Sequence, residues 1–342
     1  MPSTRQRILG IAALAAVLLL PCLATAAHAG RSSVLFTLTD PQGDDHGDGM
    51  LLYPGRPEFD RGDLDLLELT ARATDEGTLF EAVFAQPIRV PQRTAVDATG
   101  TQLTSLARYG FYTFNLDIYI DMDRTPGSGA VQALPGRRVQ IAPENAWERA
   151  ICLTPRPHEA RSSLKRMVIQ KLATDLKETT DRDQIDQLRV LVPEEMERRV
   201  FFPTQVRVSG SKISFLVPAE FLGGAAKADW SYVVAVSGSD LLQTVDLTNL
   251  LGRDSESQNL MLLGRQVGRS QDFFGGARED DELQPPLVDI IVPNGLHQEK
   301  VLRDYDLRSH RPVELIGVIP AEPNRDYGPT SIQPPVEPSR RR

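Results

Sequence analysis

Residues 40–54, DPQGDDHGDGMLLYP, gather four aspartates and three glycines into their first ten positions. Closely set carboxylates repel one another unless a positive charge lies between them. The glycines let the backbone turn sharply, so that side-chain and carbonyl oxygens can converge on one point. Calcium takes about six to eight oxygen ligands in adaptable geometry, so the segment predicts a calcium site. The predicted ligands in this loop are Asp40, Asp44, Asp45 and Asp48.

The loop is not an EF-hand. The sixth position of that motif is glycine and the twelfth is glutamate, whereas counting from Asp40 these positions hold Asp45 and Leu51. A solvated acidic turn would have the same composition, because Asp and Gly are also common turn residues. Composition alone leaves both interpretations open.

A second acidic group lies on a predicted strand, FYTFNLDIYIDMD at 111–123. Successive side chains of a strand point to opposite faces, so the even positions from Tyr112 to Met122 predict a core face. The odd positions become more acidic toward the end of the strand, and we expect that face to be open to a ligand. If the fold brings the strand end beside the opening loop, Asp121 completes the calcium site. Other acids that could complete this site are Asp60, Asp63, Asp65 and Asp123. Asp280, Asp281 and Asp289 form a third, separate candidate for metal binding, with weaker support.

Aromatic side chains are the other resource for binding, because sugars present flat C–H faces that stack on aromatic rings. Tyr119 is the strongest candidate, since it shares a predicted face with the acids. Packing in the core is the alternative for each aromatic residue. The residues predicted to bind a ligand are Tyr53, Asp117, Tyr119 and Trp147.

Catalytic and redox patterns are poorly represented. No HExxH or GxSxG pattern occurs, and Cys152 is interpreted as a half-buried strand residue. We therefore predict that the protein is not an enzyme. Neither Met50, Met122 nor the histidines single out an axial pair, so haem is not expected. The formal charge of −8 disfavours nucleic acid, whose phosphates require clustered Lys and Arg, and is compatible with cations.

The N-terminus predicts export. Two arginines precede about thirteen apolar residues, which is short of the ~20 that a membrane-spanning helix needs. The small residues Ala27 and Ala29 then suit a signal peptidase, so we predict a signal peptide over 1–29 with cleavage after Ala29. Pro21 directly before Cys22 argues against a lipid anchor. We expect a secreted or periplasmic protein with no transmembrane segment after cleavage.

Most of the chain from residue 30 to 320 predicts antiparallel β structure, because short runs rich in Val, Ile, Phe, Tyr and Thr alternate with turn residues. Residues 162–179 change to a helical period, and a helical insertion is predicted over 158–192. Two sheets packed face to face would account for the rest. The Pro-rich segment 321–342 predicts a disordered tail.

Several motifs are similar to the C-terminal module of glucodextranase and of S-layer-associated amylopullulanases. They begin with DPQGDDHGDGMLLYP, FDRGDLDLLELTA, YTFNLDIYIDMDRTPGSG, LPGRR and WERAI, and continue through VFFPTQVRVSG, WSYVVAVSG, FFGGAREDD, PPLVDIIVPNG and QEKVLRDYD. The resemblance covers most of the chain from about Val34 to Pro320. It implies an antiparallel β-sandwich of the DOMON and carbohydrate-binding type with a non-catalytic role.

The sequence therefore predicts an exported, mainly β protein that binds calcium and a polysaccharide or cell-envelope polymer. One alternative is a structural component whose sheet edges pair with envelope proteins and which binds no small ligand. The other is an electron-transfer accessory protein, since DOMON-like sandwiches also hold haem.

Overall fold

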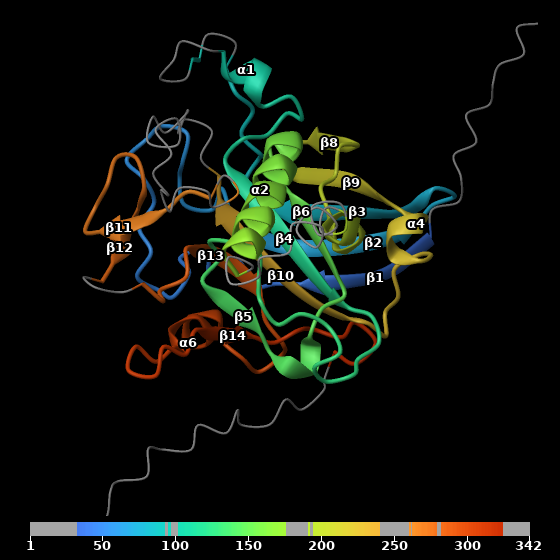
Figure 1. Cartoon of the computed structure of the whole chain (residues 1–342). Helices are drawn as coiled ribbons and strands as arrows, with labels where there is room; N and C mark the ends of the chain where they lie inside the picture. Colours follow the sequence, from blue (N-terminus) through green and yellow to red (C-terminus); the bar gives the residue numbers. More distant parts are fainter. Residues whose placement is uncertain are drawn as a thin grey trace, which may run out of the picture. The chain divides into compact units, whose positions relative to one another are not determined.

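Figure 1 shows the computed structural model, which describes residues 33–92, 95–96, 102–175, 191, 194–239, 260, 262–278 and 282–323. The predicted signal peptide, most of the second half of the predicted insertion, and the tail beyond residue 323 lie outside the described residues. The described chain is mainly β, and two five-stranded sheets form a β-sandwich.

The first sheet has the strand order β1-β2-β3-β9-β8, and every neighbouring pair is antiparallel. Its strands alternate between buried and partly exposed residues, which is the pattern of a sheet with one face on the core. The strands are β1 (Ser33–Thr39), β2 (Leu66–Ala73), β3 (Gly77–Phe84), β8 (Val206–Ser209) and β9 (Lys212–Pro218).

The second sheet has the order β13-β10-β4-β6-β7 and is antiparallel except for the β6–β7 pair. Every residue of β4, β10 and β13 is buried, so both faces of this sheet are covered. The strands are β4 (Phe114–Asp121), β6 (Arg149–Leu153), β7 (Val200–Phe201), β10 (Ser231–Gly238) and β13 (Leu287–Ile291).

The main core lies between the two sheets. Phe80 and Phe84 of the first sheet and Phe114, Leu116 and Ile118 of the second belong to one buried cluster. This confirms that the even positions of β4 form a core face.

The outer face of the second sheet packs on a separate buried cluster. Tyr119 and Cys152 lie on the sheet side of this cluster, and residues of helices and short strands cover them. The covering elements are β5 (Val139–Ile141), β14 (Val313–Leu315), α2 (Pro157–Asp175) and α6 (Gln298–Arg303). Figure 1 shows α2, in green, in the region of β4 and β6.

A helix lies between β6 and β7, as the periodicity predicted, and its described residues form α2, whose Ala160 and Leu164 are buried in the outer cluster. Two short strands that no sequence pattern predicted are β11 (Arg265–Val267) and β12 (Phe274–Ala277). Further elements are α1 (Leu103–Leu106), a 3-10 turn (Pro143–Asn145) and α4 (Ala219–Leu222), and residues 194–199 before β7 are also helical. Within the described residues, no helix combines the length and the apolar character needed to cross a membrane.

Candidate functional site

The acidic loop at 40–49 lies against β13 and the start of α6. The amide of Gly47 donates to the carbonyl of Val288 at 2.8 Å. Gly47 has a φ of +59°, and a Cβ there would lie 2.6 Å from the carbonyl oxygen of Leu287, so this close approach requires glycine. The loop is thus joined to a strand far along the chain.

Gln298, at the first turn of α6, fixes this contact from the other side and is only 3 % exposed. Its side-chain amide donates to the carbonyls of Asp44 at 2.5 Å and Val288 at 3.3 Å. Its side-chain oxygen accepts from the amide of Ile290 at 2.7 Å. One buried side chain therefore connects the loop, β13 and α6.

Three aspartates meet at this junction. One carboxylate oxygen from each of Asp40, Asp44 and Asp289 lies within 4.8 Å of the others. Asp40 follows β1, Asp44 belongs to the loop, and Asp289 is a fully buried residue of β13. Asp65, directly before β2, is 2 % exposed and accepts from the amide of Gly43 at 2.8 Å. We call these four residues the first carboxylate group.

Several oxygens of the first carboxylate group have no hydrogen-bond partner in the described part of the chain. The buried oxygens without a partner are both carboxylate oxygens of Asp40, Oδ1 of Asp44 and Oδ1 of Asp65. Buried polar atoms are normally satisfied, because an unmade hydrogen bond costs about 1–3 kcal/mol. The orphaned oxygens are thus the expected ligand atoms for a cation.

The electrostatics agree with this geometry. Burial, followed by the charge of Asp44, raises the pKa of Asp40 to about 8. Burial, followed by Asp40 and Asp44, raises the pKa of Asp289 well above its usual range. Burial also raises the pKa of Asp65, to about 6. At neutral pH the repulsion among these carboxylates is relieved either by a proton that one of them keeps or by a cation that they share.

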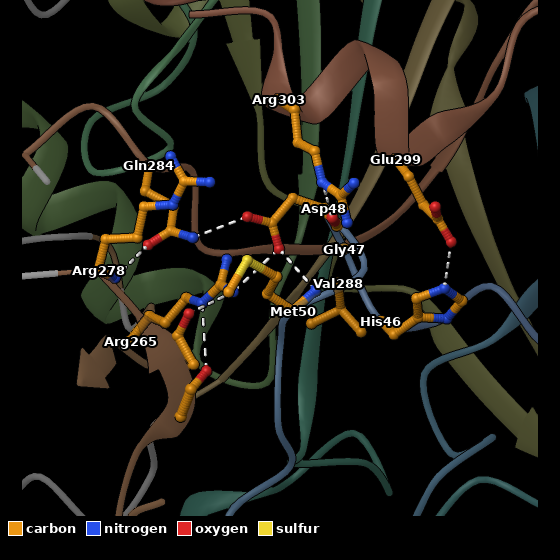
Figure 2. A network of polar contacts seen from close by, with 12 residues as sticks. His46, Gly47, Asp48, Met50, Arg265, Arg278, Gln284, Val288, Glu299 and Arg303 are labelled. Atoms are coloured by element: carbon orange, nitrogen blue, oxygen red, sulfur yellow. Dashed lines mark hydrogen bonds and ion pairs between the residues drawn. The ribbon is translucent and has the colours of Figure 1, made fainter. Parts of the chain in front are cut away.

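Asp48, which was predicted as a ligand, lies in a different environment (Figure 2). Its Oδ1 accepts from the amide of Met50 at 3.0 Å and from Nη2 of Arg265 at 2.9 Å. Its Oδ2 accepts from the side-chain amide of Gln284 at 2.7 Å. Since Arg265 already neutralises this buried carboxylate, Asp48 acts as an internal ion-pair partner in the structure. Figure 2 also shows Arg303 of α6 donating to the backbone carbonyl of Asp48.

Asp45 also lies outside the first carboxylate group. Its Oδ2 accepts from the hydroxyl of Tyr53 at 2.5 Å and from the amide of Gly62 at 2.6 Å. The predicted four-residue ligand set therefore divides, because Asp40 and Asp44 meet Asp289 whereas Asp45 and Asp48 hold other parts of the fold.

Asp121 is not brought to the opening loop. Across the second sheet, Asp289 of β13 pairs with Val236 of β10, and Val236 pairs with Leu116 near the start of β4. Asp121 lies at the other end of β4. Asp121 lies instead with Asp123 and Glu148. The expectation of one combined site is wrong, because the strand end and the loop lie at opposite ends of the second sheet.

The odd face of β4 is not open, contrary to the expectation from its polarity. Asp117 is 1 % exposed and forms an ion pair with fully buried Arg137 at 2.6 Å. The hydroxyl of Tyr119 accepts from the amide of Leu134 at 3.0 Å. Trp147 packs on Tyr119 and lies under the guanidinium of Arg199. These three predicted ligand-binding residues are part of the covered outer face.

Tyr53 differs, because it lines a hollow of about 340 Å³ at the surface. Its ring also packs edge-on against Phe274 of β12, and burial raises the pKa of its hydroxyl well above the usual range. The residues lining the hollow are Leu52, Tyr53, Gly55, Arg269, Ser270 and Gln271.

Sequence reasoning placed Asp289 only in a weak third candidate and did not identify Gln298. Asp289 interrupts an otherwise apolar strand, VDIIV, and an acid in such a run is a signal because buried acids require a partner. Gln298 carries no comparable signal, since glutamine is common at exposed helix starts.

A family model matches residues 35–317, and its description is the C-terminal, SLH-like binding module of glucodextranase. The chain belongs to this family. The match covers both sheets of the sandwich, the acidic loop and α6, and it describes a binding module of the glucodextranase C-terminal type, which is not a catalytic domain. No curated protein matches the chain.

Proposed function

We propose that this protein is an exported, non-catalytic module that binds a glycan or cell-envelope polymer and is stabilised by calcium. The observation that carries the proposal is the match of residues 35–317 to a family described as a binding module. The signal peptide predicted over 1–29, with cleavage predicted after Ala29, supports a secreted or periplasmic location.

The hollow beside Tyr53 is the proposed polymer site. Its volume of about 340 Å³ falls at the lower end of the roughly 300–1,000 Å³ typical of ligand pockets. Arg269 and Gln271 offer donors for sugar hydroxyls, and Leu52 offers an apolar surface. The other three candidates, Asp117 and Tyr119 on β4 and Trp147 just before β6, are buried, which favours this hollow over them.

The polymer proposal is tested by co-sedimentation of the full-length chain with purified cell-wall polymer and by calorimetry with soluble dextran. We expect Arg269→Ala combined with Gln271→Ala to abolish binding. The matched control is Arg161→Ala, which lies in a separate hollow with Arg149 and Phe221. Equal binding by both variants would place the polymer elsewhere, and absence of binding together with a defined oligomer would favour an assembly role.

Calcium is the proposed occupant of the first carboxylate group. Asp40, Asp44, Asp65 and Asp289 supply hard oxygen ligands, which calcium prefers. The rival is a proton shared between Asp40 and Asp289, which also relieves their repulsion.

Thermal unfolding separates the two. With calcium about a hundredfold above its dissociation constant, linkage predicts about 2.7 kcal/mol of added stability. We expect chelation to lower the midpoint of the wild-type chain and to have less effect on Asp40→Asn. An unchanged midpoint after chelation would favour the shared proton.

A further inference from the structure

A second carboxylate group lies where β4 ends, around the loop that leads to β5. One carboxylate oxygen from each of Asp121, Asp123 and Glu148 lies within 4.8 Å of the others. Asp121 is the last residue of β4, and Glu148 directly precedes β6, its neighbour in the sheet. We call these three residues the second carboxylate group.

Asp121 is the buried member of the second carboxylate group and is 1 % exposed. Its Oδ1 accepts from the amide of Arg124 at 2.6 Å. Its Oδ2 is buried and has no hydrogen-bond partner in the part of the chain that the structure describes. A buried carboxylate oxygen without a donor is costly unless the group takes up a proton or a cation faces it.

Three other buried aspartates of the fold are neutralised by arginine side chains. Asp48 contacts Arg265, Asp63 contacts Arg89, and Asp117 contacts Arg137. Within the described ranges, none of the carboxylates of the second group forms an ion pair with Lys or Arg.

The arginine side chains near the second carboxylate group contact other partners. Arg124 pairs with Glu322 at 2.7 Å, although its own amide contacts Asp121. Arg149 donates to the backbone carbonyls of Phe221 and Glu148. The positive charge that the second carboxylate group requires is therefore not provided by these side chains.

The backbone makes room for the group. A Cβ at position 129 would lie 2.6 Å from both the carbonyl oxygen of Ala146 and Oε1 of Glu148, so glycine lets the loop pass close to this backbone and to the carboxylate. The other oxygen of Glu148 accepts from the amide of Met122 at 2.7 Å. Asp123 is exposed and accepts from the amide of Thr125 and the hydroxyl of Ser128.

We propose that Asp121, Asp123 and Glu148 bind a second divalent cation of the calcium class, independently of the first carboxylate group. Three carboxylates supply hard oxygen ligands, and calcium tolerates the irregular arrangement of a strand end and a loop. The bound ion would join the end of β4 to the start of β6 and order the loop between them. This site goes beyond the proposed polymer binding and does not depend on it.

Calcium stoichiometry of the full-length chain tests the proposal by calorimetry. We expect two ions per wild-type chain and one per chain in Asp121→Asn, which keeps the size of the side chain. Asp123→Asn is the second variant, because its exposed position leaves the core intact. The matched control is Asp75→Asn, an exposed acid in the turn between β2 and β3, which should bind two ions.

Terbium luminescence excited through tryptophan gives an independent measurement. Trp147 precedes Glu148, and Trp230 precedes Ser231, which is paired with Asp121. We expect Asp123→Asn to remove most of the sensitised emission and Asp40→Asn to leave most of it.

The outcomes separate the two cation proposals. A single ion that is lost in Asp123→Asn but kept in Asp40→Asn supports the second site and overturns the first. A single ion that is lost only in Asp40→Asn overturns the second site. Two ions retained in both Asp121→Asn and Asp123→Asn would also overturn it.

Discussion

Two kinds of buried carboxylate in this protein differ in what neutralises them. Asp48 and Asp117 are neutralised by buried arginines, whereas Asp65, Asp121 and Asp289 have no such partner among the described residues. The division matters because the first kind is complete without any ligand, while the second kind needs protons or cations. Burial alone would not have distinguished them.

Arg137 shows how much a buried arginine partner of a carboxylate contributes to the stability of the fold. We expect Arg137→Met to lower the free energy of unfolding by about 3–5 kcal/mol, because it leaves Asp117 buried and unpaired. Urea denaturation measures the change. Combining it with Asp117→Leu should recover most of the stability, and a double variant as unstable as the single one would contradict the role of the unpaired charge.

Asp40 makes the stability of the metal-free chain depend on pH. Its pKa is about 8 in the folded chain against an ordinary 3.8, so the folded state holds a proton that the unfolded state releases. Its contribution is complete below about pH 4 and is lost as the pH rises toward 8. We expect melting in chelator to weaken over this window, and added calcium to raise the midpoint more at about pH 8 than at about pH 5. An equal calcium effect at both pH values would exclude Asp40 as a ligand.

At the scale of elements, α6 is short but holds the acidic loop in place. Gln298 satisfies groups on the loop and on β13 together, and Arg303 donates to the carbonyl of Asp48. The position of Asp44 relative to Asp289 therefore depends on a helix that contributes no carboxylate to the site.

We expect Gln298→Ala to destabilise the fold by about 1–3 kcal/mol, because buried backbone groups lose their partner. It should also weaken calcium binding, which a calorimetric titration measures. Lys300→Ala on an exposed position of the same helix is the control. Unchanged calcium affinity in Gln298→Ala would show that the loop holds its position without α6.

The strands were largely predictable, and their covering layer was not. Alternation located the inner face of β4 correctly, since Phe114, Leu116 and Ile118 are in the core. Alternation could not show that β5, β14 and α2 cover the other face, because a polar residue such as Asp117 looks the same whether water or Arg137 neutralises it. Short strands such as β11 and β12 lack enough residues to show a period.

At the scale of the whole molecule, the acidic loop was recognisable from the sequence because its residues are adjacent. The complete first carboxylate group was not recognisable, because its members are far apart in the sequence. Asp289 of the second sheet meets Asp40, which follows β1 of the first sheet, only because the two sheets pack together, and no local pattern encodes that packing. The resemblance to the glucodextranase C-terminal module was visible in ordered motifs across the chain, and the family match over 35–317 bears it out.

Export predicts a defined mature N-terminus. We expect the exported chain to begin at Gly30, as intact-mass measurement of the protein from the culture medium or periplasm would show. Ala29→Leu should retain the precursor mass, because a signal peptidase requires a small residue there. A mature chain that still contained residues 1–29 would contradict cleavage.

The contact between Asp44 and Gln298 spans 254 positions of the chain. When a polypeptide emerges N-terminus first from a ribosome or a secretion channel, its acidic loop appears long before β13 and α6, which complete the first carboxylate group. Until those last segments arrive, the early aspartates remain hydrated and unable to converge. This region is therefore expected to fold late, after the C-terminal segments with β13 and α6 have emerged.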